Sequence, residues 1–350
     1  MKKLLMVVLM VSMVAAVFAN GNSENQASSE MAAKSKPLIV YSPQGDEARG
    51  GWIMEKCKEQ VGLDIQFLTA TGGDIAERLM AEKLNPQADV VFGLVQTAMY
   101  QLKDENMFYS YVPDWASGLM DTYKDKDGYF HCFWQTPIVI GYNSEVMTAE
   151  QAPKDWIDLI KPEYKEKYIL GGVGSQTVRT YVIGFLWNYL DKTTGEVSEE
   201  GWEALRVLFA NTGAYPTGSS SYAAMKEGYA PIILNWFGGV KSKTEQMGIP
   251  VAYVTPANGT PVVSESIAIV KGSKNLEDAK KFVEWFGSPA FMAEYANHFG
   301  QAPVHPEAIA LCNDSVKADA MMFTAQEIDW ELASAHLNDW LEKIQLEIMP

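Results

Sequence analysis

Short apolar, β-branched runs alternate along the chain with stretches whose apolar residues recur every three or four positions, and the alternation begins at Pro37. Strands are predicted at 38–41, 63–68 and 88–93, and amphipathic helices at 47–61 and 75–83 lie between them. Successive strand–helix units of this kind predict a parallel sheet with helices on its faces.

A second α/β segment follows a long extended stretch at 129–143. The pattern predicts helices at 177–190, 199–211 and 222–227, and strands at 232–235 and 251–254. Another extended stretch at 262–270 leads into C-terminal helices that begin with 276–286. Two α/β segments joined by long crossovers predict two lobes, each a mostly parallel sheet flanked by helices. Ligand-binding loops at the carboxyl ends of the strands are expected to meet in a cleft between the lobes.

These elements divide the chain into three predicted parts after its N-terminal region. Residues 37–138 form lobe 1, and residues 139–262 form lobe 2. Residues 263–350 return across the hinge and supply C-terminal helices that both lobes share.

The N-terminus reads as an export signal. Lys2 and Lys3 precede an apolar run at 4–18, and Val17 and Ala19 are small residues at positions −3 and −1 of a cleavage site. The run is shorter than the roughly 20 residues that a spanning helix needs. We therefore predict a signal peptide at 1–19 cleaved after Ala19, and a flexible polar lead-in at 20–36. The alternative is an uncleaved N-terminal anchor. No cysteine near the cut could carry a lipid.

Charge narrows the range of partners. The chain has 28 Lys and Arg against 44 Asp and Glu, a net charge of −16, and removal of Lys2 and Lys3 makes it −18. Such a charge repels nucleic acid and anionic membrane surfaces. An anionic ligand is still compatible with it, because backbone donors inside a cleft can dominate locally.

The cysteines and histidines predict neither a metal site nor a cofactor. Cys57, Cys132 and Cys312 lack metal-ligand spacing, and the four histidines are scattered. Cys57 and Cys132 lie in apolar contexts typical of core residues. One disulfide would suit an oxidising compartment, but the sequence does not fix the pair.

A family resemblance extends over nearly the whole mature chain. The pieces that carry it are LIVYSPQGD (38–46), GGDIAERLMAEKLNPQADVVFG (72–93), DKDGYFHCFWQTPIVIGYN (125–143), WIDLIKPEYKEKYILGG (156–172), SSSYAAMKEGYAPIIL (219–234), SIAIVKGSKNLEDAKKFVEWFGSPAFMAEY (266–295) and QAPVHPEA (301–308). Their order resembles the type II periplasmic solute-binding proteins, in the family of Fe(III), thiamine, phosphonate and sugar-phosphate receptors. The resemblance implies a periplasmic, monomeric, two-lobed receptor that captures a solute by hinge closure and delivers it to an ABC permease without catalysing a reaction.

The chain departs from the iron-binding members of that family. Those members resemble one another in a tandem Tyr-Tyr after the strand that here precedes Trp236 and Phe237, and in a His or acidic ligand where this chain has Gln44. Neither Trp nor Phe supplies an anionic oxygen to a hard cation. An Fe(III) receptor with a non-standard site, for example one built from Tyr41, Asp46 and Glu265, stays open as an alternative.

Three polar loops favour an oxyanion as ligand. They precede helices, where unpaired N–H groups and the helix dipole attract negative charge. The alternative interpretation of their Ser and Thr residues is ordinary helix capping. Arg179 could bind a phosphate or carboxylate in bidentate fashion, or pair with a neighbouring acid. The candidate residues are Thr69, Thr71, Gly72 and Gly73; Ser175, Gln176 and Thr177; and Ser219 and Ser220.

Two tryptophans suit the body of such a ligand. Trp134 and Trp236 fall near a crossover and a strand end, where an indole can stack on a sugar or another flat face. Core packing is the other interpretation of each. The predicted ligand is therefore an organic molecule with a phosphoryl or carboxylate head. Further candidate contacts are Tyr41, Ser42, Gln44, Gln96, Gln135, Asn235 and Glu265.

Two other classes of function remain to be compared with a receptor. An enzyme is not expected, because the chain has no GxSxG or SxxK nucleophile and its GGVGSQ segment (171–176) lacks GxxxxGK[ST]. A surface adhesin or scaffold on the same fold stays open, because fold does not determine function.

Overall fold

The chain divides into two units, Met1–Ser35 and Lys36–Pro350. The computed structural model describes residues 36–214 and 220–349. The predicted signal peptide (1–19), nearly all of the lead-in (20–36) and Ser219 lie outside the described residues.

The first half of the sheet follows the predicted strand–helix pattern. Strand β1 (Leu38–Tyr41) pairs in parallel with β2 (Ile65–Leu68) and β3 (Val90–Val95), and α1 (Arg49–Val61) and α2 (Gly72–Ala81) connect them. A further helix, α3 (Gln96–Asp104), follows β3 directly and is not among the predicted elements.

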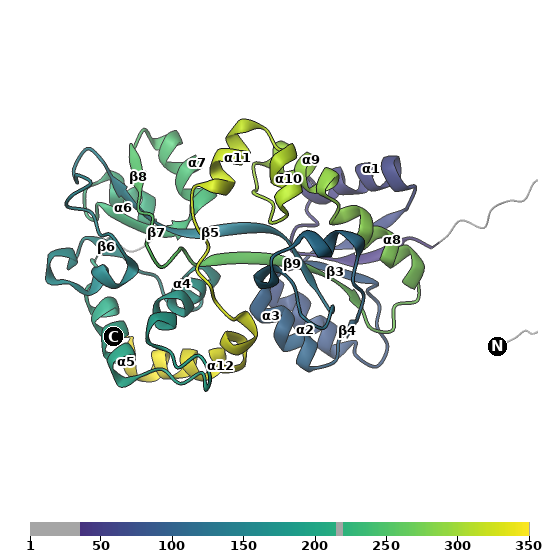
Figure 1. The fold of residues 1–350 in the computed structure, drawn as a ribbon, viewed down its shortest axis with the longest axis horizontal. Coiled ribbons are helices and arrows are strands. Elements are labelled where there is room, and N and C mark those ends of the chain that lie inside the picture. The colour runs from purple at the N-terminus through teal and green to yellow at the C-terminus, as the bar shows by residue number, and fades with distance from the viewer. Residues whose placement is uncertain (1–35, 215–219, 350) are drawn as a thin grey trace, which may run out of the picture. The chain divides into compact units, whose positions relative to one another are not determined.

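Two long strands connect this half to the second. Strand β9 (Val262–Val270) lies between β3 and β5 (His131–Asn143). β5 pairs with β9 through 131–137 and then with β7 (Ile232–Trp236) and β8 (Val251–Tyr253) through 138–143. The short β4 (Phe108–Tyr109) pairs with β9, and β6 (Tyr168–Ile169) pairs with β7. Figure 1 shows β5 and β9 running side by side between the two groups of elements.

The α/β class is confirmed, but the prediction of mostly parallel sheets is wrong. Of the strand pairs in residues 36–214 and 220–349, only β1–β2, β1–β3 and β6–β7 are parallel. Each pair that includes β5 or β9 is antiparallel, because these strands carry the chain across and back. The predicted boundaries at 138/139 and 262/263 fall where β5 changes partners and where β9 begins, and they stay predictions.

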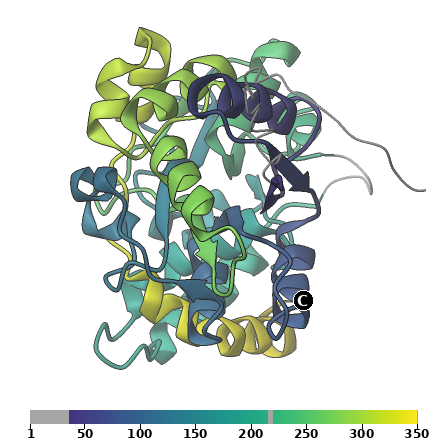
Figure 2. The ribbon, with the colours of Figure 1, turned by 90° about the vertical axis from the view of Figure 1, so that its right-hand side faces the viewer.

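Helices cover both faces of the first half. α1, α8 (Leu276–Phe286) and α9 (Pro289–Phe299) lie on one face, and α2, α3 and α12 (Trp330–Lys343) lie on the other (Figures 1 and 2). Leu38 and Val40 accordingly pack in one core cluster, whereas the neighbouring Tyr41 packs in the other. Burial on both faces explains why these strands are continuously apolar rather than alternating.

The remaining helices belong to the second half and to the C-terminal segment. They are α4 (Gln176–Leu186), α5 (Glu199–Ala210), α6 (Ser221–Lys226), α7 (Phe237–Met247), α10 (Pro306–Leu311) and α11 (Asp314–Met321). Short 3₁₀ turns occupy Asp114–Gly118, Asp121–Tyr123, Trp156–Ile160, Pro162–Tyr164 and Trp187–Tyr189, and a π turn occupies Ile344–Ile348.

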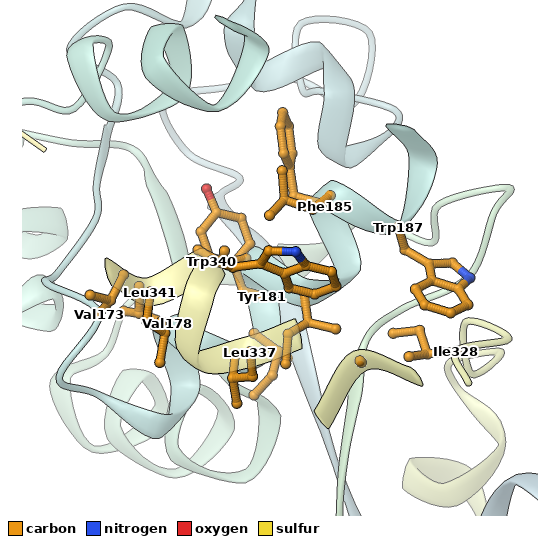
Figure 3. Close-up of a cluster of buried hydrophobic side chains, with 14 of the residues drawn as sticks. Val173, Val178, Tyr181, Phe185, Trp187, Ile328, Leu337, Trp340 and Leu341 are labelled. Atoms are coloured by element: carbon orange, nitrogen blue, oxygen red, sulfur yellow. The ribbon is translucent and has the colours of Figure 1, made fainter. Parts of the chain in front are cut away.

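Helix α12 contacts elements of both halves. Its residues Leu337 and Trp340 share a buried cluster with Tyr181 of α4 (Figure 3). On the other side, the Ser334 hydroxyl donates to the Thr97 carbonyl of α3 at 2.9 Å. The C-terminal helix therefore joins α3 to α4. Among the described residues, no helix has both the length and the apolarity that crossing a membrane would require.

The three cysteines are free and buried. Burial raises the pKa of the Cys57 and Cys132 thiols to about 12, and it raises that of Cys312 as well. The core placement predicted for Cys57 and Cys132 is confirmed, and the structure pairs none of the three.

The thiolate is the reactive form of cysteine, and the raised pKa values keep the three thiols protonated at pH 8. In the folded protein we therefore expect almost none of them to react with a thiol reagent within minutes. Denatured without reductant, it is expected to show three reactive thiols per chain. The measurement is an absorbance titration with a disulfide reagent. One reactive thiol after denaturation would instead reveal a disulfide.

Candidate functional site

A cavity of about 680 Å³ is lined by both halves of the sheet and by the C-terminal segment. Arg49 of α1, Glu265 of β9 and residues 299–302 contribute from the first half. The first turns of α4 and α7 contribute from the second half, and α11 adds Ser315, Val316 and Asp319. The cavity is large enough for a small organic molecule.

Glu265 is a half-buried residue whose carboxyl lines this cavity. Its Oε2 accepts hydrogen bonds from the Trp134 indole N–H and from the Gln44 amide. Among the described residues, no hydrogen bond to its Oε1 is found. The carboxyl is thus fixed through one oxygen, while the other is free to meet a ligand.

Burial raises the pKa of Glu265 to about 7, and the Trp134 and Gln44 hydrogen bonds and the Arg49 charge only partly offset that rise. A carboxyl with such a pKa exists in both forms near neutral pH. Perturbed carboxyls in cavities are frequent at functional sites.

Two β-bulges flank Glu265. In β3 the register shifts at Gly93, whose φ of +86° is a conformation that favours glycine. In β5 the register shifts at Phe133, immediately before Trp134, which pairs with Glu265. Bulges often re-aim side chains next to binding sites, and here they bring the Trp134 indole onto the Glu265 carboxyl.

Arg49 supplies a positive charge beside Glu265. Its guanidinium Nη1 donates to Gln44 Oε1 and to Gln301 Oε1, each at 3.2 Å. In the described part of the chain, no carboxylate lies within ion-pair distance of it, whereas Arg78 and Arg206 each have such a partner. The guanidinium is therefore held by neutral amides and can pair with an incoming anion.

Three helices begin at the cavity without a side-chain cap. Val95 precedes α3, Ser175 precedes α4 and Trp236 precedes α7, and none of them accepts a capping hydrogen bond. Val95, Gln176 and Trp236 all line the cavity. Side-chain caps are present on α2, α5, α6, α9, α10, α11 and α12. The N-cap residues of α1 and α8 also lack one, although the Asp46 carboxylate accepts from the first N–H groups of α1. Uncapped N–H groups and dipoles at the cavity favour an anion.

Trp236 presents a flat apolar surface to the cavity. Its side chain is 46% exposed, and it lies against the first turn of α7. A Cβ at Gly239 would lie 2.5 Å from Trp236 Cε2, so the glycine makes room for the indole. The ring is positioned to stack on a ligand rather than to fill the core.

The structure brings part of the predicted ligand set together. Gln135, Gln176, Thr177, Trp236 and Glu265 line the cavity. Gln44 and Trp134 lie directly behind Glu265 and bond to it. For Trp134 the core interpretation also applies, because the ring is 3% exposed and stacks on Tyr295 with centroids 4.3 Å apart.

The other predicted residues do not line this cavity. Thr71 and Ser220 cap α2 and α6, as the capping interpretation proposed. The Arg179 Nε donates to the Val173 carbonyl, and the Tyr41 hydroxyl bonds to Glu82. The remaining residues away from the cavity lining are Ser42, Thr69, Gly72, Gly73, Gln96, Ser175 and Asn235.

Several residues that line the cavity were missed by the sequence analysis. Arg49, Phe299, Gln301 and Lys241 are the main ones. Arg49 is the first residue of the helix that follows β1, and that position near a strand's carboxyl end is the signal that could have identified it. The described residues contain no group of three or more His, Cys, Asp or Glu side chains arranged to hold a metal ion.

Comparisons with known proteins agree with the fold. The profile of the bacterial extracellular solute-binding protein family matches residues 52–324. A probable ABC transporter periplasmic-binding protein of Sinorhizobium fredii is 46% identical over 311 residues, covering 89% of this chain and 86% of that protein. The putrescine-binding periplasmic protein SpuD of Pseudomonas aeruginosa is 26% identical, covering 85% and 86%.

Two solved structures of the same fold are of proteins named or described with different ligands. A ferric binding protein from Campylobacter jejuni has a TM-score of 0.74 at 19% identity, covering 89% of this chain and 99% of that one. The periplasmic binding protein AfuA from Actinobacillus pleuropneumoniae, with exogenous fructose-6-phosphate bound, has a TM-score of 0.64 at 21% identity, covering 89% and 99%. The predicted two-lobed periplasmic-binding-protein fold is confirmed.

The raised pKa of Glu265 predicts a pH-dependent cost of burial. The pKa is about 7 in the folded chain against 4.5 for an ordinary Glu, so the folded state binds the proton more tightly. The free energy of unfolding is unaffected below pH 4.5, and it falls by about 3 kcal/mol in total as the pH rises from 4.5 to 7. Glu265→Gln is therefore expected to stabilise the ligand-free protein at pH 8 and to leave it nearly unchanged at pH 4.5.

Denaturant unfolding at the two pH values measures this difference. The matched control is Glu245→Gln, which removes an exposed carboxylate from the same cavity and is expected to have little effect at either pH. An equal effect of Glu265→Gln at both pH values would contradict the pKa assignment.

Proposed function

We propose that this chain, which belongs to the bacterial extracellular solute-binding protein family and is the periplasmic-binding protein of an ABC transporter, captures an organic anion in its cavity. The observation that carries the choice of ligand is the Arg49 guanidinium, which lines the cavity with neutral amides as its hydrogen-bond partners.

An anion at Arg49 would also face the uncapped N-termini of α3, α4 and α7. Charge-assisted hydrogen bonds from a guanidinium and from helix N–H groups are stronger than neutral ones, and they need no net positive charge on the protein. Trp236 supports an organic body on this anion, because its exposed ring offers a stacking surface of little use to inorganic phosphate.

Two other ligand classes fit the cavity less well. A diamine with no anionic group would bring positive charge towards Arg49 and the positive ends of the helix dipoles. Fe(III) prefers several anionic oxygens, whereas Trp236 and Phe237 provide none. Of the three carboxyls that line the cavity, Glu265 is partly protonated and Asp319 is paired with Lys241, which leaves the exposed Glu245. Fe(III) bound through a different set of oxygens is the alternative that the ligand panel below addresses.

The remaining parts of the proposal concern transport. The protein is exported after cleavage following Ala19, acts as a monomer, binds neither nucleic acid nor membrane, and releases its solute unchanged to a permease. Capture proceeds by closure of the two halves about β5 and β9, which removes the ligand from water. An adhesin or scaffold on this fold would not respond to any small solute.

A ligand panel tests this function. In a thermal-shift screen of residues 20–350, organic phosphates, phosphonates and carboxylates are expected to raise the melting temperature, whereas Fe(III) and diamines are not. A ligand at a free concentration of 100 times its Kd stabilises the folded protein by about 2.7 kcal/mol, which such a screen detects easily. Stabilisation by Fe(III) or putrescine alone would contradict the proposal, and no response to any solute would favour the adhesin or scaffold.

Arg49→Gln is expected to weaken binding of the best organic anion at least about 10-fold, because a charge-assisted hydrogen bond contributes 1.5–3 kcal/mol. The control Arg206→Gln removes an exposed arginine that pairs with Glu203 on α5, away from the cavity, and should leave Kd unchanged. Titration calorimetry measures both variants. Equal Kd values for Arg49→Gln and the wild type would show that Arg49 does not bind the ligand.

Trp236→Ala is expected to reduce affinity for the organic anion about 3- to 10-fold while leaving inorganic phosphate unaffected, because only the organic body stacks on the ring. Tyr229→Ala is the control, since Tyr229 is a half-exposed aromatic residue that does not line the cavity. Calorimetry with both ligands checks the difference. Loss of affinity for inorganic phosphate to the same degree would indicate that Trp236 supports the cavity instead.

A further inference from the structure

The charged groups around Glu265 form an arrangement that a simple anion would not complete. Arg49 and Glu265 both bond to the same Gln44 amide, the guanidinium to its oxygen and the carboxylate to its nitrogen. One side-chain amide therefore separates a positive group from a carboxyl at the cavity wall. An anion paired with Arg49 would lie close to the Glu265 carboxylate and be repelled by it, unless something between them donates a hydrogen bond.

We propose that Glu265 selects the ligand: its free oxygen accepts a hydrogen bond from a hydroxyl or ammonium group that the organic anion carries next to its anionic head. This inference rests on the proposed function, because it assumes the anionic head at Arg49. It narrows the substrate class to anions with an adjacent O–H or N–H donor, and it excludes anions that are acceptors only.

The geometry assigns the accepting role to Oε1. Trp134 and Gln44 donate to Oε2, and two donors on one oxygen favour the ionised carboxyl and direct it. Gln44 is itself held, since its Oε1 accepts from the Tyr295 hydroxyl at 3.1 Å and from Arg49. With Oε2 fully occupied, the hydrogen bond from a ligand goes to Oε1, for which the described residues provide no partner.

Few ionisable groups of the protein could take the place of the ligand as a partner of Glu265 Oε1. Arg49 faces Glu265 from α1, and burial raises the pKa of Tyr295 on α9, which stays neutral. β3 and β5 present the neutral Val95 and Trp134. On the far side of the cavity, Lys241 of α7 is paired with Asp319 of α11 at 2.7 Å, and Glu245 is exposed. A donor on the ligand is thus the group that would let Glu265 ionise when the cavity closes.

The test compares matched ligands with and without a donor group. 2-Aminoethylphosphonate and propylphosphonate differ by an ammonium in place of a methyl group, and glycerol 3-phosphate and propyl phosphate differ by two hydroxyls. In at least one pair, the donor-bearing ligand is expected to bind the wild type at least about 10-fold more tightly in calorimetry at pH 8. The pair that shows the preference identifies the donor as ammonium or hydroxyl.

Glu265→Gln is expected to bring that ratio to about 1. With its amide oxygen held by Trp134 and Gln44, the new side chain would present N–H to the cavity and could no longer accept. Glu55→Gln, which changes an exposed carboxylate on α1 that does not line the cavity, is expected to keep the wild-type ratio. Thermal unfolding of each ligand-free variant verifies that it is folded.

Acidification provides a second measurement on the same proteins. Relative to Glu265→Gln, the wild type is expected to lose affinity for the donor-bearing ligand between pH 8 and pH 5.5, because protonation removes the negative charge that makes Oε1 a strong acceptor. The difference between the two proteins cancels the titration of the ligand itself. Tighter binding by the wild type at low pH would mean that a protonated Glu265 donates to the anion, and would overturn the inference.

The remaining outcomes separate this inference from the proposed function. If anions bind but both members of each pair bind equally, or if Glu265→Gln keeps the preference, the role of Glu265 is wrong and the anionic ligand stands. If none of the four probes nor any other organic anion binds, the anionic ligand is wrong and this inference fails with it.

Discussion

The antiparallel pairing of β5 with β9 is the interaction on which the rest of the structure depends. Residues 131–137 of β5 lie against β9, and the same strand then continues into the second half of the sheet through 138–143. Because these strands are also the connections between the halves, their pairing fixes where the cavity forms. Glu265 lies on β9 next to that point, bonded to Trp134 of β5. A movement of one half relative to the other would therefore reach Glu265 directly.

Much of the fold could be predicted, because its strands and several of its helices have strong local patterns. The predicted strands at 38–41 and 262–270 and the helix at 276–286 match β1, β9 and α8. Strand direction could not be predicted, since apolar runs are the same in parallel and antiparallel pairs when both faces are buried. Helices α3 and α7 were also missed. Both start directly after a strand with no side-chain cap, and so lack the usual signal for a helix start.

The site was predicted in part, for a related reason. Ser and Thr before a helix indicated anion sites, yet Thr71 and Ser220 use their hydroxyls as caps. The helix starts at the cavity are the uncapped ones of α3, α4 and α7, which contribute Val95 and the first turns of α4 and α7 to its lining. Two of the three begin without a Ser or Thr that could signal them. Arg49 was missed because its importance depends on Gln44 and Gln301, and the latter lies 252 positions away. Contacts of that range leave no local pattern.

A crystal structure of the protein with its tightest-binding organic anion would test the central claim most directly. The account predicts the anionic head against Arg49 and the first turns of α4 or α7, with a ligand hydroxyl or ammonium at hydrogen-bond distance from Glu265 Oε1. An anionic head bound elsewhere in the cavity, with Arg49 still bonded to Gln44 and Gln301 alone, would contradict it.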